Sequence, residues 1–248
     1  MADFLRQLGI LTGCALVVWA LSRILGCNAC ILGISRPKRS IAFAAAAAVV
    51  TFGITFAILI VHHARHGADG HDPMMGKLWT QMLVPVIDIV PGAIAMFLLR
   101  EPPASAGFTR RCLWQAVVVG AVLSVAAFYL TPGGFWHRIA RINASKSELL
   151  LFFAFVGFGE EFLFRGFLQN RLIAWLGRWW GLAAASAIMA LAHVPHRLLI
   201  EGFGPWQSFV EAARLLPGSL LLGWTMLRLQ NLVAPAMMHA FLDWSVSI

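Results

Sequence analysis

The stretch Leu149-Leu-Leu-Phe-Phe-Ala-Phe-Val-Gly-Phe-Gly-Glu-Glu-Phe-Leu-Phe-Arg-Gly-Phe-Leu168 is an apolar run that contains two adjacent acids, Glu160 and Glu161, and one base, Arg165. A helix of about 20 apolar residues is long enough to cross a bilayer. A charged side chain near the bilayer centre costs roughly 3 kcal/mol, so charged residues are found there mainly with a partner or a function. The stretch therefore predicts a membrane-spanning helix that carries a buried polar site.

The composition of the whole chain favours the same class of protein. Of its 248 residues, 60% are hydrophobic and 12% are charged, whereas about 25% of the residues of an ordinary soluble domain are charged. We expect an all-α, polytopic membrane protein that forms a single transmembrane domain over residues 1–248. Hydrophobic windows predict about eight transmembrane helices, at 8–27, 41–61, 79–99, 113–130, 149–168, 179–199, 206–227 and 232–248.

The chain is basic, with a formal net charge of +8. Its 19 lysines and arginines are spread through nearly every predicted loop and are not interleaved with aromatic residues in one stripe. Attraction to the membrane surface explains this distribution, and nucleic-acid binding is not expected. The lipid bilayer is the first partner that the sequence predicts.

Two groups of potential metal or redox residues are not assigned a function. Cys14 and Cys112 are expected to be small apolar packing residues, and the pair Cys27 and Cys30 has CxxC spacing without a second pair. A predicted loop between 62 and 78 contains a cluster that could bind a metal adventitiously. Its members are His62, His63, His66, His71, Asp69 and Asp72.

The first part of a candidate site lies on the span 149–168. Glu161 and Arg165 are i,i+4 neighbours in the favourable acid-first order, so they are expected to neutralise each other. Glu160 then lies about 100° around the helix without a local partner. A carboxylate in a low-dielectric site beside a second carboxylate is suited to accept a proton from water, so Glu160 is the predicted general base.

The second part of the candidate site comes from two later spans. His239 and Asp243 are again i,i+4 neighbours, so the acid can orient the imidazole. His193 is followed by Pro195, which is expected to end or kink its helix and to leave it beside a cavity. Glu160, His193 and His239 are expected to converge around either one activated water or one divalent metal, with zinc the expected ion.

A purely structural interpretation competes with the functional one for each of these residues. A single intramembrane histidine can be an interhelical hydrogen-bonding group, and a single Glu–Arg pair can lock two helices together. The whole set together favours a functional site. Asp88, between Pro85 and Pro91, is open to two interpretations, pairing with an arginine or lining the cavity, and we favour the pairing.

The order Glu160-Glu161-x-x-x-Arg165, His193 and His239-x-x-x-Asp243 resembles the CPBP family of intramembrane proteases, which includes CAAX proteases and bacteriocin-processing proteins. The resemblance covers about 148–248, which would be the catalytic core. The family motifs are EExxxR, FxxxH and HxxxN or HxxxD. Position 189 is Met where the second motif usually has Phe, which we interpret as an apolar replacement in the cavity wall.

The resemblance implies a role for each matching residue. Glu160 resembles the catalytic glutamate and His193 the histidine that helps it activate water, while Glu161 and Arg165 resemble the supporting pair. His239 and Asp243 resemble the groups that hold the oxyanion or position the water. The family has been described both as glutamate-type and as metal-dependent. We favour the mechanism without a cofactor, with one zinc on Glu160, His193 and His239 as the alternative.

The function expected from this resemblance is that of an intramembrane endopeptidase. Its substrate would be a membrane-associated protein or peptide, prenylated or not, cut near its C-terminus. The alternative from another class is a transporter or immunity protein that uses the buried acids as a proton relay. A multi-pass location in a prokaryotic inner membrane is expected from the short chain without an appended domain.

Overall fold

The computed structural model describes residues 2–27, 33–66, 83–131 and 134–248, and all regular elements within these residues are helices. The first part of the chain contains α1 (Ala2–Ile24), α2 (Pro37–His66), α4 (Leu83–Leu99), the short 3₁₀ helix η1 (Pro103–Ala106), α5 (Leu113–Leu130) and α6 (Phe135–Arg141). The second part contains α7 (Ala144–Glu161), the π-helix η2 (Phe162–Gln169), α8 (Asn170–Leu176), α9 (Arg178–Ala192), α10 (Val194–Leu199), α11 (Pro205–Ala213), α12 (Leu216–Leu229) and α13 (Val233–Ser247). The expected all-α class is confirmed.

Several helices are apolar enough to lie in a membrane. Within the described residues, three are long enough to cross one, at Pro37–Arg65, Leu113–Leu130 and Arg178–Leu199, and two shorter apolar helices occupy Gly9–Ile24 and Leu83–Leu99. Large hydrophobic side chains are widely exposed on the surface, as in Phe97, which is 82% exposed. A soluble monomer rarely exposes so much contiguous apolar surface. These features indicate a multi-pass membrane protein.

The helix boundaries differ from the predicted spans in two places. The predicted span 206–227 is two helices, α11 and α12, because the chain turns after Ala213 and Pro217 lies in the first turn of α12. A proline is tolerated only in that first turn, where its missing N–H has no partner to lose. The predicted span 149–168 is part of a longer helical segment that runs from α7 through η2 into α8.

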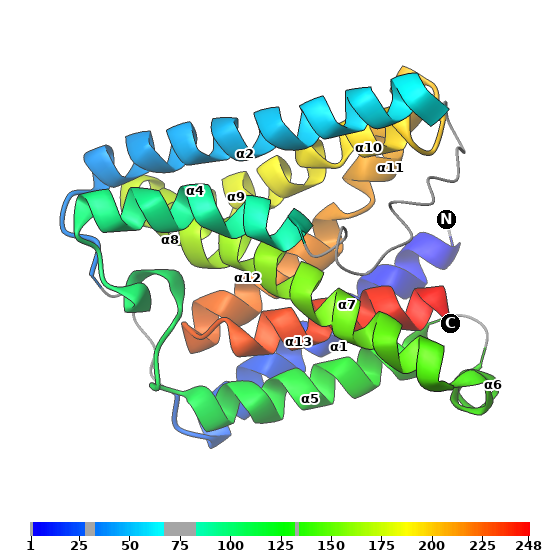
Figure 1. Cartoon of the computed structure of the whole chain (residues 1–248). Coiled ribbons are helices and arrows are strands. Elements are labelled where there is room, and N and C mark those ends of the chain that lie inside the picture. Colours follow the sequence, from blue (N-terminus) through cyan, green and yellow to red (C-terminus); the bar gives the residue numbers. More distant parts are fainter. Residues whose placement is uncertain (1, 28–32, 67–82, 132–133) are drawn as a thin grey trace.

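The helices that carry the candidate site pack closely against one another. α7 and α13 lie side by side in the middle of the molecule, with α5 along the other side of α13 (Figure 1). Gly157 permits this approach, since a Cβ there would lie 3.1 Å from the backbone nitrogen of Ala240. Gly159 likewise lets α4 approach α7, because a Cβ would lie only 2.7 Å from Pro85 Cα.

A disulfide joins Cys27, just after α1, to Cys112, just before α5. The expectation that Cys112 is a free apolar packing residue is therefore wrong. Cys30 lies outside the described residues, and Cys27, the other cysteine of the CxxC spacing, is bonded to Cys112. Cys14 is the free cysteine of the described part and lies on α1 among apolar neighbours, as expected.

The first half of the predicted histidine loop is helical in the structure. His62, His63 and His66 belong to α2, which continues to His66, and His63 Nδ1 lies 2.7 Å from the carbonyl oxygen of Leu199. The remaining members of the cluster, at 69, 71 and 72, lie outside the described residues. One nitrogen of a candidate metal ligand, His63 Nδ1, therefore already contacts a backbone carbonyl oxygen.

Loss of the disulfide should destabilise the protein. We expect Cys112→Ser to lower the free energy of unfolding by about 2–4 kcal/mol, because the bond closes a long loop, of sequence separation 85, in the unfolded chain. Thermal unfolding in detergent measures the effect, with Cys14→Ala as the control that removes an unpaired cysteine. A reductant should lower the wild-type melting temperature to that of Cys112→Ser. Equal melting temperatures for wild type and variant under oxidising conditions would contradict this expectation.

Candidate active site

The two glutamates lie at the C-terminal end of α7. The helix begins at Asn143, whose side chain accepts a hydrogen bond from the backbone N–H of Lys146 and so caps the first turn. It continues without interruption into the π-helix η2 directly after Glu161. Such π-helical turns are frequent at functional sites, because the wider turn changes the direction in which the following side chains point. The sequence spacing alone did not reveal this element.

Glu161 and Arg165 form the expected ion pair, with 3.1 Å between Glu161 Oε1 and Arg165 Nη1. Both side chains are almost completely buried. Arg165 Nη2 also donates a hydrogen bond to Ser219 Oγ on α12 at 3.2 Å. Glu161 Oε1 lies in addition 2.8 Å from His239 Nδ1 on α13. Glu161 thus connects Arg165 to the imidazole, a role that the sequence did not predict.

His239 has a carboxylate oxygen facing each of its ring nitrogens. Nδ1 lies 2.8 Å from Glu161 Oε1 and Nε2 lies 3.3 Å from Asp243 Oδ2. An ionised carboxylate can only accept hydrogen bonds, so both contacts are satisfied together when both ring nitrogens carry protons. The arrangement therefore favours the imidazolium form of His239, which is suited to stabilise a developing negative charge.

His193, unlike His239, has a backbone carbonyl oxygen at Nδ1 and, among the described residues, no close hydrogen-bond partner at Nε2. It lies between α9 and α10, at the helix break predicted from Pro195. Its Nδ1 lies 2.9 Å from the carbonyl oxygen of Met189, which can only accept a hydrogen bond, so Nδ1 carries the ring proton. In the neutral ring Nε2 is then an acceptor, and it lies 3.9 Å from Glu160 Oε2.

Glu160 lies between the two imidazoles. Its Oε2 is 3.9 Å from His193 Nε2 and 3.9 Å from His239 Nε2. The structure thus brings Glu160, His193 and His239 together, as their positions in the sequence predicted. Glu160 Oε2 is buried and has no hydrogen-bond partner within the described protein. An unpartnered buried acceptor is rare and indicates room for a water molecule or a substrate group.

The metal alternative would place one ion between these three side chains. Zinc ligands lie about 2.0–2.2 Å from the ion, and no group of three acids, histidines or cysteines in the described residues has the arrangement of metal ligands. His239 Nε2, which the metal alternative requires as a ligand, instead faces Asp243. Nε2 would have to lose its proton and turn from Asp243 before it could bind a metal.

Asp88 also belongs to this neighbourhood. It is buried on α4, and within the described residues it forms no ion pair with an arginine, contrary to the expected pairing. Glu160 is near enough to interact with it electrostatically. Gly159 accounts for this proximity, since it lets the backbone of Pro85 contact α7 three residues before Asp88.

The structure is that of an α-helical protein with apolar, membrane-type helices in which two glutamates and two histidines lie together. Comparison with known families agrees, because residues 143–245 match the type II CAAX prenyl endopeptidase Rce1-like family. Residues 143–245 form a domain of this family, also called CPBP, which begins at the cap of α7 and ends within α13. No curated protein and no solved structure matches the chain.

The family match decides the class of function. It is a family of proteases, so the expectation of an enzyme is confirmed and the transporter or immunity-protein alternative receives no support. All six site residues predicted from the sequence, Glu160, Glu161, Arg165, His193, His239 and Asp243, lie inside the matched segment. Their individual catalytic roles stay a prediction.

Proposed function

We propose that the protein is an intramembrane endopeptidase in which Glu160 activates a water molecule to hydrolyse a peptide bond of a membrane-associated substrate. The observation that carries this proposal is the 3.9 Å separation of two acceptors, Glu160 Oε2 and His193 Nε2. Two acceptors cannot hydrogen-bond to each other, but one water molecule can donate a hydrogen to each. Its lone pairs then remain available to attack a carbonyl carbon.

The proposed reaction uses the chain's own residues at each step. Glu160 takes a proton from the water as the water oxygen bonds to the carbonyl carbon of the substrate. The resulting oxyanion is stabilised by the protonated His239, which Glu161 and Asp243 hold in place. Glu160 then returns the proton to the leaving amine, the C–N bond breaks, and both products leave with the enzyme unchanged. His193 orients the water through Nε2.

An apolar groove beside the two catalytic helices supports a hydrophobic substrate. The groove has a volume of about 540 Å³ and lies between α7 and α13, the helices of Glu160 and His239. It is lined by Ala154, Phe158, Ala236, Ala240 and other apolar side chains. Binding sites of this size and polarity are typical for small apolar ligands or side chains. We infer that it receives the hydrophobic part of the substrate, which includes a prenyl group in the CAAX case.

We also infer a location in a prokaryotic inner membrane, in which about eight membrane-crossing segments would surround a polar cavity formed by the later helices. The helical segment from α7 to α8 and the helices α9, α12 and α13 would form this cavity. The support is the burial of Glu161, Arg165 and His239 among apolar helices, since such residues are expensive in lipid unless they face a protein interior.

Cleavage of a panel of C-terminal peptides by the purified protein tests this function. Each peptide is supplied with and without a prenylated cysteine, and the products are read by mass spectrometry. We expect hydrolysis of at least one membrane-bound peptide by wild type and none by His193→Ala. Wild type should keep its activity after exhaustive dialysis against a chelator. If dialysis abolishes the activity and added zinc restores it, the water is activated by a metal and not by Glu160 alone.

A further inference from the structure

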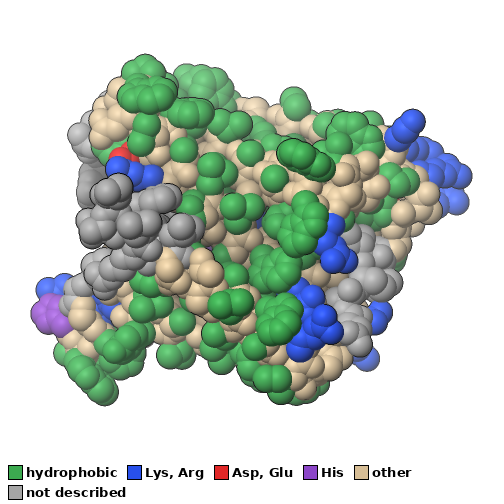
Figure 2. All heavy atoms as spheres, turned by 180° about the vertical axis from the view of Figure 1, so that it is seen from behind, with side chains coloured by type: hydrophobic (Ala, Val, Ile, Leu, Met, Phe, Trp, Pro, Cys, Tyr) green, Lys and Arg blue, Asp and Glu red, His purple; other side chains and the backbone are tan. Residues whose placement is uncertain are grey.

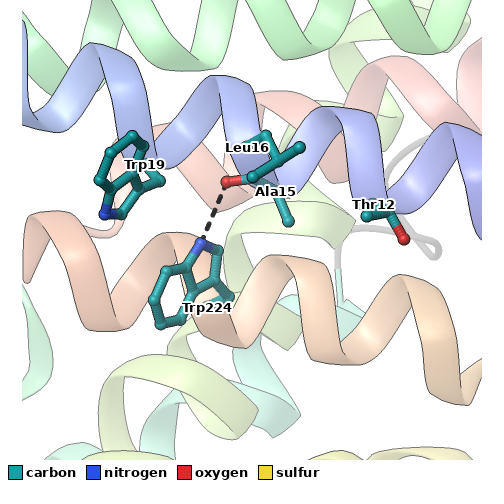
Figure 3. Close-up of a pocket in the computed structure, with 5 residues that line it drawn as sticks. All are labelled: Thr12, Ala15, Leu16, Trp19 and Trp224. Carbon is teal, nitrogen blue, oxygen red and sulfur yellow. Dashed lines mark hydrogen bonds between the residues drawn. The ribbon is translucent and has the colours of Figure 1, made fainter.

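A second groove lies between α1 and α12 and is lined by none of the candidate catalytic residues. It has a volume of about 310 Å³ and is lined by Thr12, Ala15, Leu16, Trp19 and Trp224. In Figure 3 the indole of Trp19 projects from α1 and that of Trp224 from α12, and Trp224 Nε1 donates to the carbonyl oxygen of Ala15 at 3.3 Å. This hydrogen bond fixes the orientation of one ring, so the groove has a defined wall.

The two helices repeat the same pair of residues at their C-terminal ends. Trp19 and Arg23 are i,i+4 neighbours on α1, and Trp224 and Arg228 are i,i+4 neighbours on α12. The two helices run in the same direction. Ala15 contacts Trp224, and Ser22, further along α1, contacts Arg228, further along α12. Both arginines therefore lie at the same end of the groove, beyond its two indoles.

A third arginine joins this end of the groove. Trp179 of α9 stacks on Trp224 with 5.9 Å between the ring centroids, and Arg178 precedes it. Arg23 and Arg178 are exposed, and both lie close enough to repel the guanidinium of Arg228 electrostatically. Arg228 itself is held in place by two hydrogen bonds to Ser22 Oγ, at 3.0 and 2.9 Å. Within the described residues, none of the three arginines forms an ion pair.

The helix dipoles do not account for all three charges. A basic residue in the last turn of a helix is favourable, which explains Arg23 and Arg228. Arg178 is the first residue of α9, where the positive end of the dipole disfavours a cation. An anion bound beside Arg228 would offset its repulsion by Arg23 and Arg178. On the face opposite to that of Figure 1, Lys and Arg side chains are seen at both sides of a largely hydrophobic surface, with more of them on the right (Figure 2).

We propose that the α1–α12 groove binds an anionic phospholipid, with the phosphate of the headgroup between Arg23, Arg178 and Arg228 and an acyl chain along Leu16 and Ala15. Two features select a lipid over another occupant. The groove itself is apolar and three cations, Arg23, Arg178 and Arg228, lie toward one end of it, which complements a molecule with an apolar tail and an anionic head. The indoles lie between these two parts, the position that tryptophan prefers at the interface of a membrane.

Native mass spectrometry of the full-length protein in detergent tests the proposal, with phosphatidylglycerol and phosphatidylcholine of the same chain length as probes. Wild type should bind phosphatidylglycerol more tightly. Because one basic residue near a membrane surface contributes about a fivefold change in affinity for an anionic lipid, Arg178→Gln/Arg228→Gln should lower the affinity for phosphatidylglycerol more than about tenfold. Glutamine retains a hydrogen-bond donor for Ser22, so the helix contact is kept.

The matched control is Arg39→Gln. Arg39 also lies over an aromatic ring, with its guanidinium carbon 5.7 Å from the centroid of Phe43, but it is on α2, away from this groove. Its replacement should leave the affinity for phosphatidylglycerol unchanged. In a second variant, Leu16→Trp should fill the groove and weaken binding of both lipids while the arginines remain.

Three results would overturn the proposal. They are equal affinity of wild type for the two lipids, an equal loss of affinity in Arg39→Gln and in the double variant, and stabilisation of the protein by glycerol phosphate as strong as that by phosphatidylglycerol. The last result would assign the arginines to a soluble phosphate. None of these measurements depends on proteolysis, so they stand apart from the proposed catalytic function.

Discussion

Glu160→Gln is expected to lower kcat about 10³-fold while leaving the protein folded, since removal of a general base typically costs between 10² and 10⁴. Glutamine has nearly the shape of glutamate, and its amide oxygen can still accept a hydrogen bond from the water. It cannot take a proton from that water. The 19% exposure of the Glu160 side chain and the absence of an ion pair to arginine or lysine in the described residues mean that little stability depends on its charge.

The measurement is single-turnover cleavage of the best peptide, together with the melting temperature of each variant in detergent. Glu148→Gln is the matched control, because it makes the same substitution on an exposed position of the same helix. Its activity should equal that of wild type. A Glu160→Gln protein with wild-type activity would remove Glu160 from the role of general base.

Local spacing predicted the parts of the site that lie within one helix. The i,i+4 rule placed Glu161 beside Arg165 and His239 beside Asp243, and the structure has both pairs, at 3.1 and 3.3 Å. The helix break at His193 was equally predictable, because Pro195 cannot continue the hydrogen bonding of α9. These features depend on neighbours within one or two turns, which the order of residues contains directly.

Contacts between distant residues were not accessible in this way. The hydrogen-bonding contact between Glu161 and His239 spans 78 positions and exists because Gly157 lets α7 and α13 approach closely. The disulfide between Cys27 and Cys112 spans 85 positions, and no bond was predicted from the sequence for either cysteine. Helix packing decides such contacts, and a single sequence does not state which faces meet.

The split of the predicted span 206–227 has a different cause. Its hydrophobic content was sufficient for a membrane span, but Glu211 and Arg214 form a surface ion pair at the end of α11, and α12 begins two residues after Arg214. In the sequence, this charged pair marks the boundary between α11 and α12. Average hydrophobicity over a window of about 20 residues hides such a boundary, which the positions of charged and proline residues reveal.

Arg165→Ala is expected to lower the free energy of unfolding by about 3–5 kcal/mol, which is typical when one partner of a buried ion pair is removed. Arg165 is 1% exposed and pairs with Glu161, which is completely buried. Its removal leaves the Glu161 carboxylate with only His239 as a charged partner at short distance, and it deprives Ser219 of a donor. The folded yield should fall for this reason, and with it the activity.

The matched control is Arg214→Ala, which removes the arginine of the exposed pair with Glu211. Exposed pairs contribute about 0–1 kcal/mol, so this variant should unfold close to wild type. Thermal unfolding in detergent compares the two variants, and wild-type stability and activity in Arg165→Ala would reject the supporting role of the pair.

Adding Glu161→Gln to Arg165→Ala separates the effect of the charge from that of packing. If the uncompensated carboxylate causes the loss, the double variant should be more stable than Arg165→Ala alone, although it stays inactive because the neutral amide no longer holds His239 as an imidazolium.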